Sequence, residues 1–136
     1  FFFFFFSIAL GALSVASVTS FGLASSETNP VQVATVVLAP AVSPNQELKI
    51  ASNAPSLTLS GSGFDLDGSS NSISLNLGAS AAVLSATETS LTVSFTRPPT
   101  SLGALTAVVT SFGGSSGVAT EVATVVAPPV VSESAA

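Results

Sequence analysis

Two aspartates form the only close pair of carboxylates in this sequence, so they are the first candidates for chemistry. Asp65 and Asp67 lie in FDLDGSSN, residues 64–71, where Gly68 and Asn71 follow them. A carboxylate pair can provide a general acid and a general base. Oxygen ligands at alternate positions beside a turn glycine also suit Ca²⁺, which makes Asp65, Asp67 and Asn71 calcium candidates.

The calcium signal is weak because no glutamate ends the loop to complete the ligand shell. The alternative is a polar turn between strands, in which the Asp side chains accept hydrogen bonds from turn amides. We favour the turn, and we predict that the chain holds no metal and that its fold does not depend on calcium.

Other catalytic groups are missing from the composition. The chain has no Cys and no His, and it also lacks Met, Trp and Tyr. A serine or threonine nucleophile would therefore have no imidazole base, and there is no thiolate to form a disulfide or bind a metal. We predict a protein that is not an enzyme and needs no cofactor.

Charge is sparse and acidic. Lys49 and Arg97 are the only cations against seven carboxylates, for a net charge of −5. Nucleic acid and anionic membrane surfaces would both require a basic cluster, so neither is an expected partner. The many Ser and Thr residues can carry O-linked glycans, above all near residues 98–101.

Residues 40–126 are predicted to form short strands separated by turns. In residues 56–64, Leu57 and Leu59 alternate with Thr58 and Ser60, and similar runs occur at 72–78, 90–95, 104–112 and 118–126. This period of two gives each strand one buried and one wet face, which predicts an all-β fold of two stacked antiparallel sheets. The predicted core consists of Leu57, Leu59, Phe64, Ile73, Leu75, Leu77, Leu91, Val93, Phe95, Leu105 and Val109.

The segment 102–132 has a second copy near the N-terminus. Residues 10–13 match 102–105, residues 18–22 match 109–113, and residues 33–37 match 122–126. Small loop insertions between true repeats produce such slight drifts in spacing, so the repeating unit has about ninety residues. The predicted domains are an arm that ends a preceding unit (1–37), a sandwich (38–126), and a tail or start of a next unit (127–136).

Other interpretations of the first 24 residues remain open. They are apolar and end in small residues, like a secretory signal or an anchor, although Met and a basic stretch are missing. They also resemble the N-termini of pilins, which begin with Phe and continue as an apolar helix, although Phe5 replaces the acidic residue usual in type IV pilins. We favour the repeat, in which residues 10–37 are two closing strands.

The quoted strand motifs resemble one known family. SLTLSGSGF (56–64), TSLTVSF (89–95) and GALTAVVTSFGG (103–114) resemble the IPT/TIG family over residues 40–126. This resemblance implies an immunoglobulin-like antiparallel β-sandwich, of a kind often arranged in tandem in cell-surface and secreted proteins. With the arm, the expected fold is such a sandwich preceded by extra N-terminal strands.

The arm is expected to bind other copies of the chain. A lone hairpin is marginally stable in water, and unpaired edges accept further strands. The predicted assembly interface consists of Leu13, Val18, Phe21, Val33, Val36 and Val37. Because this contact joins unlike surfaces head to tail, it predicts rings or open helical filaments rather than closed dimers, and we favour the filament.

These observations predict a structural subunit of an extracellular or cell-surface filament or tandem-repeat array. The alternative is a cell-surface adhesin module that binds carbohydrate or protein. An adhesin would concentrate aromatic residues on an exposed loop. Because Phe64, Phe95 and Phe112 all fall on strand patterns, we favour the structural role.

Overall fold

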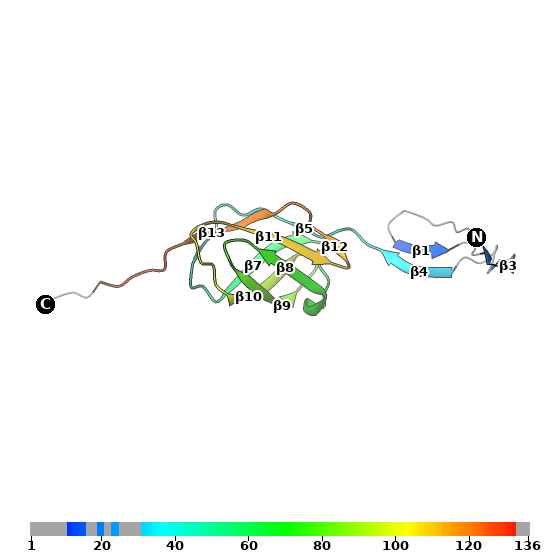
Figure 1. The fold of residues 1–136 in the computed structure, drawn as a ribbon, viewed down its shortest axis with the longest axis horizontal. Helices are drawn as coiled ribbons and strands as arrows, with labels where there is room; N and C mark the ends of the chain where they lie inside the picture. Colours follow the sequence, from blue (N-terminus) through cyan, green and yellow to red (C-terminus); the bar gives the residue numbers. More distant parts are fainter. Residues whose placement is uncertain (1–10, 16–18, 21–22, 25–30, 133–136) are drawn as a thin grey trace. The chain divides into compact units, whose positions relative to one another are not determined.

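A computed structural model describes residues 11–15, 19–20, 23–24 and 31–132 (Figure 1). The chain divides into two compact units, Phe1–Leu38 and Ala39–Ala136. The described residues contain strands and one short 3-10 helix, η1 (Gly68–Ser70). Among them, no helix is long and apolar enough to cross a membrane.

The second unit is a β-sandwich of two packed sheets. The first sheet is antiparallel, with the order β5 (Ala41–Val42), β7 (Ser56–Ser62), β10 (Ser90–Arg97) and β9 (Ser80–Ala86). In the second sheet β11 (Gly103–Ser111) pairs with β8 (Asn71–Leu75), β12 (Gly114–Ser115) and β13 (Thr120–Val126), and β13 also pairs in parallel with β6 (Lys49–Ala51). This matches the ABED and CFG sheets of constant-type immunoglobulin domains, with the first strand divided between the sheets, so the predicted immunoglobulin-like sandwich is confirmed.

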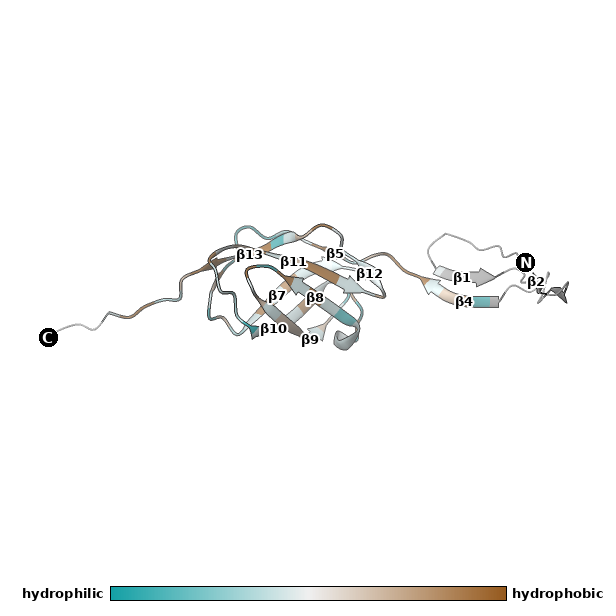
Figure 2. Cartoon of the chain, in the orientation of Figure 1, coloured by the Kyte–Doolittle hydropathy of each residue, from teal (hydrophilic) through white to brown (hydrophobic). Residues whose placement is uncertain are grey.

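The core lies where the alternating residues of both sheets face each other. Leu91 lies opposite Leu59 and Val93 opposite Leu57, so these side chains share one buried face of the β7–β10 pair. The central part of β11 is the strongly hydrophobic strand segment seen in Figure 2. Seven residues of the predicted core are buried: Leu57, Leu59, Phe64, Leu91, Val93, Leu105 and Val109.

The other predicted core residues lie at the margin of the core. Ile73, Leu75, Leu77 and Phe95 are half-buried and pack against it. The prediction missed five residues of the buried hydrophobic core, namely Ala79, Ala107, Val122, Ala123 and Val125. Three of these are alanines, whose small apolar surface gives little signal in a sequence pattern.

The first strand changes sheets at residues 43–48. The Asn45 backbone N–H donates to the Glu121 carbonyl at 2.8 Å, and the Asn45 side-chain oxygen accepts from the backbone N–H groups of Glu47 and Leu48 at 3.2 and 3.0 Å. These bonds hold the segment between β5 and β6 in a turn against β13. Packing under β5 is tight, because a Cβ on Gly61 would collide with the Ala41 carbonyl oxygen.

The described part of the N-terminal unit forms two small antiparallel ladders. Strand β1 (Gly11–Val15) pairs with β4 (Val31–Val36), and β2 (Thr19–Ser20) pairs with β3 (Leu23–Ala24). The pilin-like interpretation required a helix here, whereas these residues are strands. Residues 1–10 lie outside the described residues.

Candidate functional site

The β1–β4 hairpin has the same register as the β11–β13 pair that closes the sandwich. Gly11 lies opposite Val36, and Gly103, its counterpart in the repeat, lies opposite Val125. Both glycines have positive φ, +113° and +124°. The remaining pairs also correspond: Ala12–Thr35 to Ala104–Thr124, Leu13–Ala34 to Leu105–Ala123, Ser14–Gln32 to Thr106–Glu121, and Val15–Val31 to Ala107–Thr120. Even the register shift recurs, after Leu13 in one ladder and after Leu105 in the other.

The second ladder of the arm repeats as well. Thr19–Ala24 and Ser20–Leu23 in β2–β3 correspond to Thr110–Ser115 and Ser111–Gly114 in β11–β12. The differences in length between the two copies therefore fall outside the ladders. A repeat that preserves pairing partners is a repeat of structure as well as of sequence.

The two hairpins differ in what covers them. Val122 is 3% exposed in the sandwich core, whereas its counterpart Val33 is 57% exposed. Ala123 is fully buried and its counterpart Ala34 is exposed. The sheet that buries β13 in the sandwich has no counterpart among the described residues of the N-terminal unit, so β4 displays residues of core type.

The predicted assembly residues are only partly described. Val33 and Val37 are exposed and Val36 is half-buried, and Leu13 lies opposite Ala34 in the β1–β4 ladder. Val18 and Phe21 lie outside the described residues. Of these residues, Val33 and Val36 lie on β4 and Val37 directly follows it.

The candidate calcium residues form a turn in which their polar groups hydrogen-bond to one another and to neighbouring residues. The Asp65 backbone N–H donates to Asn71 Oδ1 at 3.0 Å, and Asn71 Nδ2 donates to the carbonyl oxygens of Asp65 and Asp67 at 2.8 and 3.0 Å. Asp65 Oδ1 accepts from the Asp67 N–H, and Asp67 Oδ1 accepts from both the N–H and the hydroxyl of Ser69. The buried hydroxyl of Ser111 also accepts from the Asp65 N–H, at 2.9 Å.

This geometry favours a structural role for the turn. Asp67 caps η1, and the hydrogen bonds from the hydroxyl and then the backbone of Ser69 lower the pKa of its carboxyl below the ordinary value. The Asn71 amide is directed to the protein's own backbone rather than to a ligand site. No group of three or more acidic side chains comes together in the described ranges.

The prediction of a strand over residues 104–112 is wrong at Phe112. It does not continue β11 but occupies a two-residue turn with Gly113, where φ is +52° and +77°. Positive φ at both positions suits a tight hairpin, yet it is unusual for a bulky side chain. Phe112 is 55% exposed, so the sandwich presents an aromatic ring at a hairpin tip. The Gly113–Gly114 pair was the available signal for this turn.

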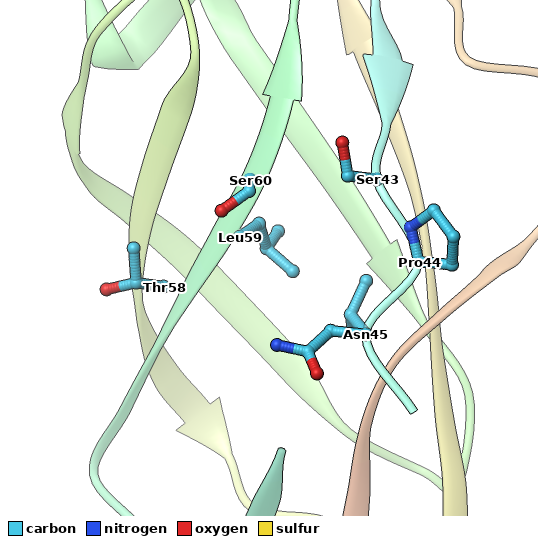
Figure 3. A pocket seen from close by; sticks show the side chains of 7 residues that line it. Ser43, Pro44, Asn45, Thr58, Leu59 and Ser60 are labelled. Carbon is cyan, nitrogen blue, oxygen red and sulfur yellow. The ribbon is translucent and has the colours of Figure 1, made fainter. Parts of the chain in front are cut away.

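A small pocket of about 130 Å³ lies beside the sheet switch (Figure 3). Its lining residues are Ser43, Pro44, Asn45, Thr58, Leu59, Ser60 and Val122. Figure 3 shows the Asn45 side chain between its own segment and β7. This lining carries no charged side chain, so it provides no acid, base or anchor for a charged ligand.

Comparisons of this chain with protein-family models, with curated proteins and with solved structures give no match. The features of the molecule that bear on its function are therefore the repeated hairpin and the turn at Phe112.

Proposed function

We propose that this protein is a structural module of an extracellular or cell-surface filament or tandem-repeat array, assembled head to tail through its N-terminal strands. One observation carries the proposal: β1–β4 repeats the ladder of β11–β13, while Val33 is exposed where Val122 is buried. A hairpin with core residues gains stability when a second layer covers it. Another copy of the chain is the proposed source of that cover.

Three further features support this proposal. The IPT/TIG resemblance of the sequence implies an immunoglobulin-like sandwich of a kind that often occurs in tandem. Pro129, Val131 and Ser132 also repeat Pro40, Val42 and Ser43, which begin the sandwich. In addition, the sequence contains no Cys nucleophile and no His base, which favours a role outside catalysis.

The proposal is tested by comparing the full chain with a chain that begins at Leu38. The shorter chain retains the whole sandwich core, so it should fold. Sedimentation velocity should show concentration-dependent assembly of the full chain and a monomer for the shorter one. A monomeric full chain, or equal assembly of the two chains, would contradict the proposal.

A second candidate function is an adhesin module, and the turn at Phe112 favours it. Strained backbone at an exposed residue is often retained for function, and aromatic side chains are frequent hot spots in interfaces. Replacing Phe112 with Ser should then abolish binding to the target polysaccharide or protein while the melting temperature is retained. If assembly is lost in that variant instead, Phe112 belongs to the self-interface.

A further inference from the structure

The chain repeats, after the sandwich, the segment that begins it. Residues 39–43, the start segment, read APAVS, and residues 128–132, the tail segment, read PPVVS. The two copies differ in what covers them. Val42 of the start segment packs against the core, whereas its counterpart Val131 is 95% exposed. The tail segment is therefore an apolar segment that no other described residue covers as the start segment is covered.

The start segment lies between two neighbours in the sandwich. On one side, β5 pairs with β7. On the other side the segment packs on β12, because a Cβ on Gly114 would lie 3.6 Å from Pro40 Cδ and 3.7 Å from the Cα of Ala39. Pro40 is buried in this place, whereas its counterpart Pro129 is exposed.

The residues that follow β5 extend this contact to β13. The Asn45 backbone N–H donates to the Glu121 carbonyl at 2.8 Å. Val122 lines the small pocket of Figure 3 together with Ser43, Pro44 and Asn45. The start of the sandwich thus packs on the closing strands β12 and β13, whose pairing the arm repeats.

The arm contains the receiving side of the same contact. Leu23 on β3 holds the position of Gly114, and Val33 on β4 holds the position of Val122. The start segment of the same chain is already part of the sandwich, so it cannot also fill this place on the arm. The tail segment of another copy is a second source of the same sequence.

The position of the tail segment suits a contact between copies. β13 continues into the tail beside Gly103, the first residue of β11, whereas Pro40 lies against Gly114, which pairs with Ser111, the last residue of β11. The tail therefore leaves the sandwich at the end opposite to the start segment, which the arm directly precedes in the chain.

We propose that the tail segment of one copy packs against β3 and β4 in the arm of a second copy, as the start segment packs on β12 and β13. This inference rests on the proposed function and names the segment that the arm receives. The contact would bury Pro129 and Val131, whose apolar surface is exposed in the single chain. Because tail and arm are unlike surfaces, each copy can both give and receive, and the contact propagates.

The first test places a charge on the tail segment. Val131→Lys should reduce assembly of the full chain at least tenfold in sedimentation velocity, because the contact would desolvate the lysine. Val118→Lys is the matched control, since Val118 is 84% exposed in the loop between β12 and β13, and it should assemble like the wild type. Far-UV circular dichroism establishes that both variants are folded.

The second test locates the contact, and the absence of Cys from the chain makes it specific. Leu23 and Pro128 hold the positions of Gly114 and Ala39, which are close enough for a disulfide. A mixture of Leu23→Cys and Pro128→Cys chains, oxidised with oxidised glutathione, should therefore form a covalent dimer of the two variants. A mixture of Leu23→Cys and Leu66→Cys chains is the control and should form far less of such a dimer.

The outcomes separate this inference from the proposed function. If Val131→Lys assembles like the wild type while the chain beginning at Leu38 is monomeric, the arm mediates assembly but does not receive the tail segment. Equal loss of assembly in both lysine variants, or equal cross-linking in both mixtures, would also overturn the role of the tail segment. If the chain beginning at Leu38 still assembles like the full chain, the proposed function itself is wrong.

Discussion

Val33 and Val122 occupy the same position in two hairpins of identical register, yet only Val122 is buried. The local sequence around them is nearly the same, VQVATVV against TEVATVV. Their different exposure therefore follows from the sheet that covers β13 and not from the strands themselves.

The first prediction uses this pair. Val122→Ala should lower the free energy of unfolding by about 2 kcal/mol, because two buried carbons are lost and a cavity remains. Val33→Ala should change it by less than about 0.5 kcal/mol in the unassembled chain. Since the chain has no Trp or Tyr, urea unfolding is followed by far-UV circular dichroism. Equal effects of the two substitutions would contradict the finding that Val122 is buried and Val33 is exposed.

The second prediction concerns Asn71, which is 6% exposed. Asn71→Ala should cost about 2–3 kcal/mol of stability, because the Asp65 and Asp67 carbonyls lose their donors in a partly buried turn. Asn53→Ala is the control, since Asn53 is exposed, and it should cost less than about 0.5 kcal/mol. Comparable losses in the two variants would show that the Asn71 hydrogen bonds contribute little.

The third prediction concerns calcium. The melting temperature should be the same in excess calcium and in EDTA, because the Asn71 amide and both Asp side chains already bind backbone groups. A site filled at 100 times its dissociation constant would add about 2.7 kcal/mol of stability. A rise in the melting temperature that EDTA reverses would establish a calcium site at Asp65 and Asp67.

The fourth prediction concerns acid. Because the folded pKa of Asp67 is lowered, its charge stabilises the fold above the ordinary aspartate pKa of 3.8, and this contribution is lost as the pH falls through the lower folded value. Asp67→Asn keeps an oxygen that can cap η1 but removes the titration. The stability difference between wild type and Asp67→Asn, measured by urea unfolding, should therefore be larger near neutral pH than in acid. A difference independent of pH would contradict this role.

The sequence predicted the sheets well because alternation is a local property. Leu57, Leu59, Leu91 and Val93 follow the period of two, and all four are buried. In the sequence, Phe112 continues the apolar pattern of its strand. The pairing of Ser111 with Gly114 nevertheless imposes a turn there, with a positive φ that Phe rarely adopts. Tertiary pairing overrode local preference at this residue.

The site was less predictable because its contacts join distant residues. Asp65 and Ser111 are far apart in the sequence, and only the packed sandwich brings the Ser111 hydroxyl to the Asp65 N–H. The repeat did indicate that residues 10–37 resemble closing strands. It also led us to expect uncovered core-type side chains there, Val33 and Val37 among them. The exposed fraction of each could not be predicted, because it depends on what packs against the strand.

The central claim is that the N-terminal hairpin is a closing hairpin of this sandwich type, which no sheet among the described residues covers. It is tested most directly by replacing residues 103–126 of the full chain with a copy of residues 11–37 and measuring thermal unfolding by far-UV circular dichroism. Because Leu13, Val33, Ala34 and Val36 would replace Leu105, Val122, Ala123 and Val125, the account predicts a cooperative transition in the grafted chain. A graft carrying Asp in place of Val33 and Val36 should not fold. Loss of the cooperative transition in the unmodified graft would contradict the claim.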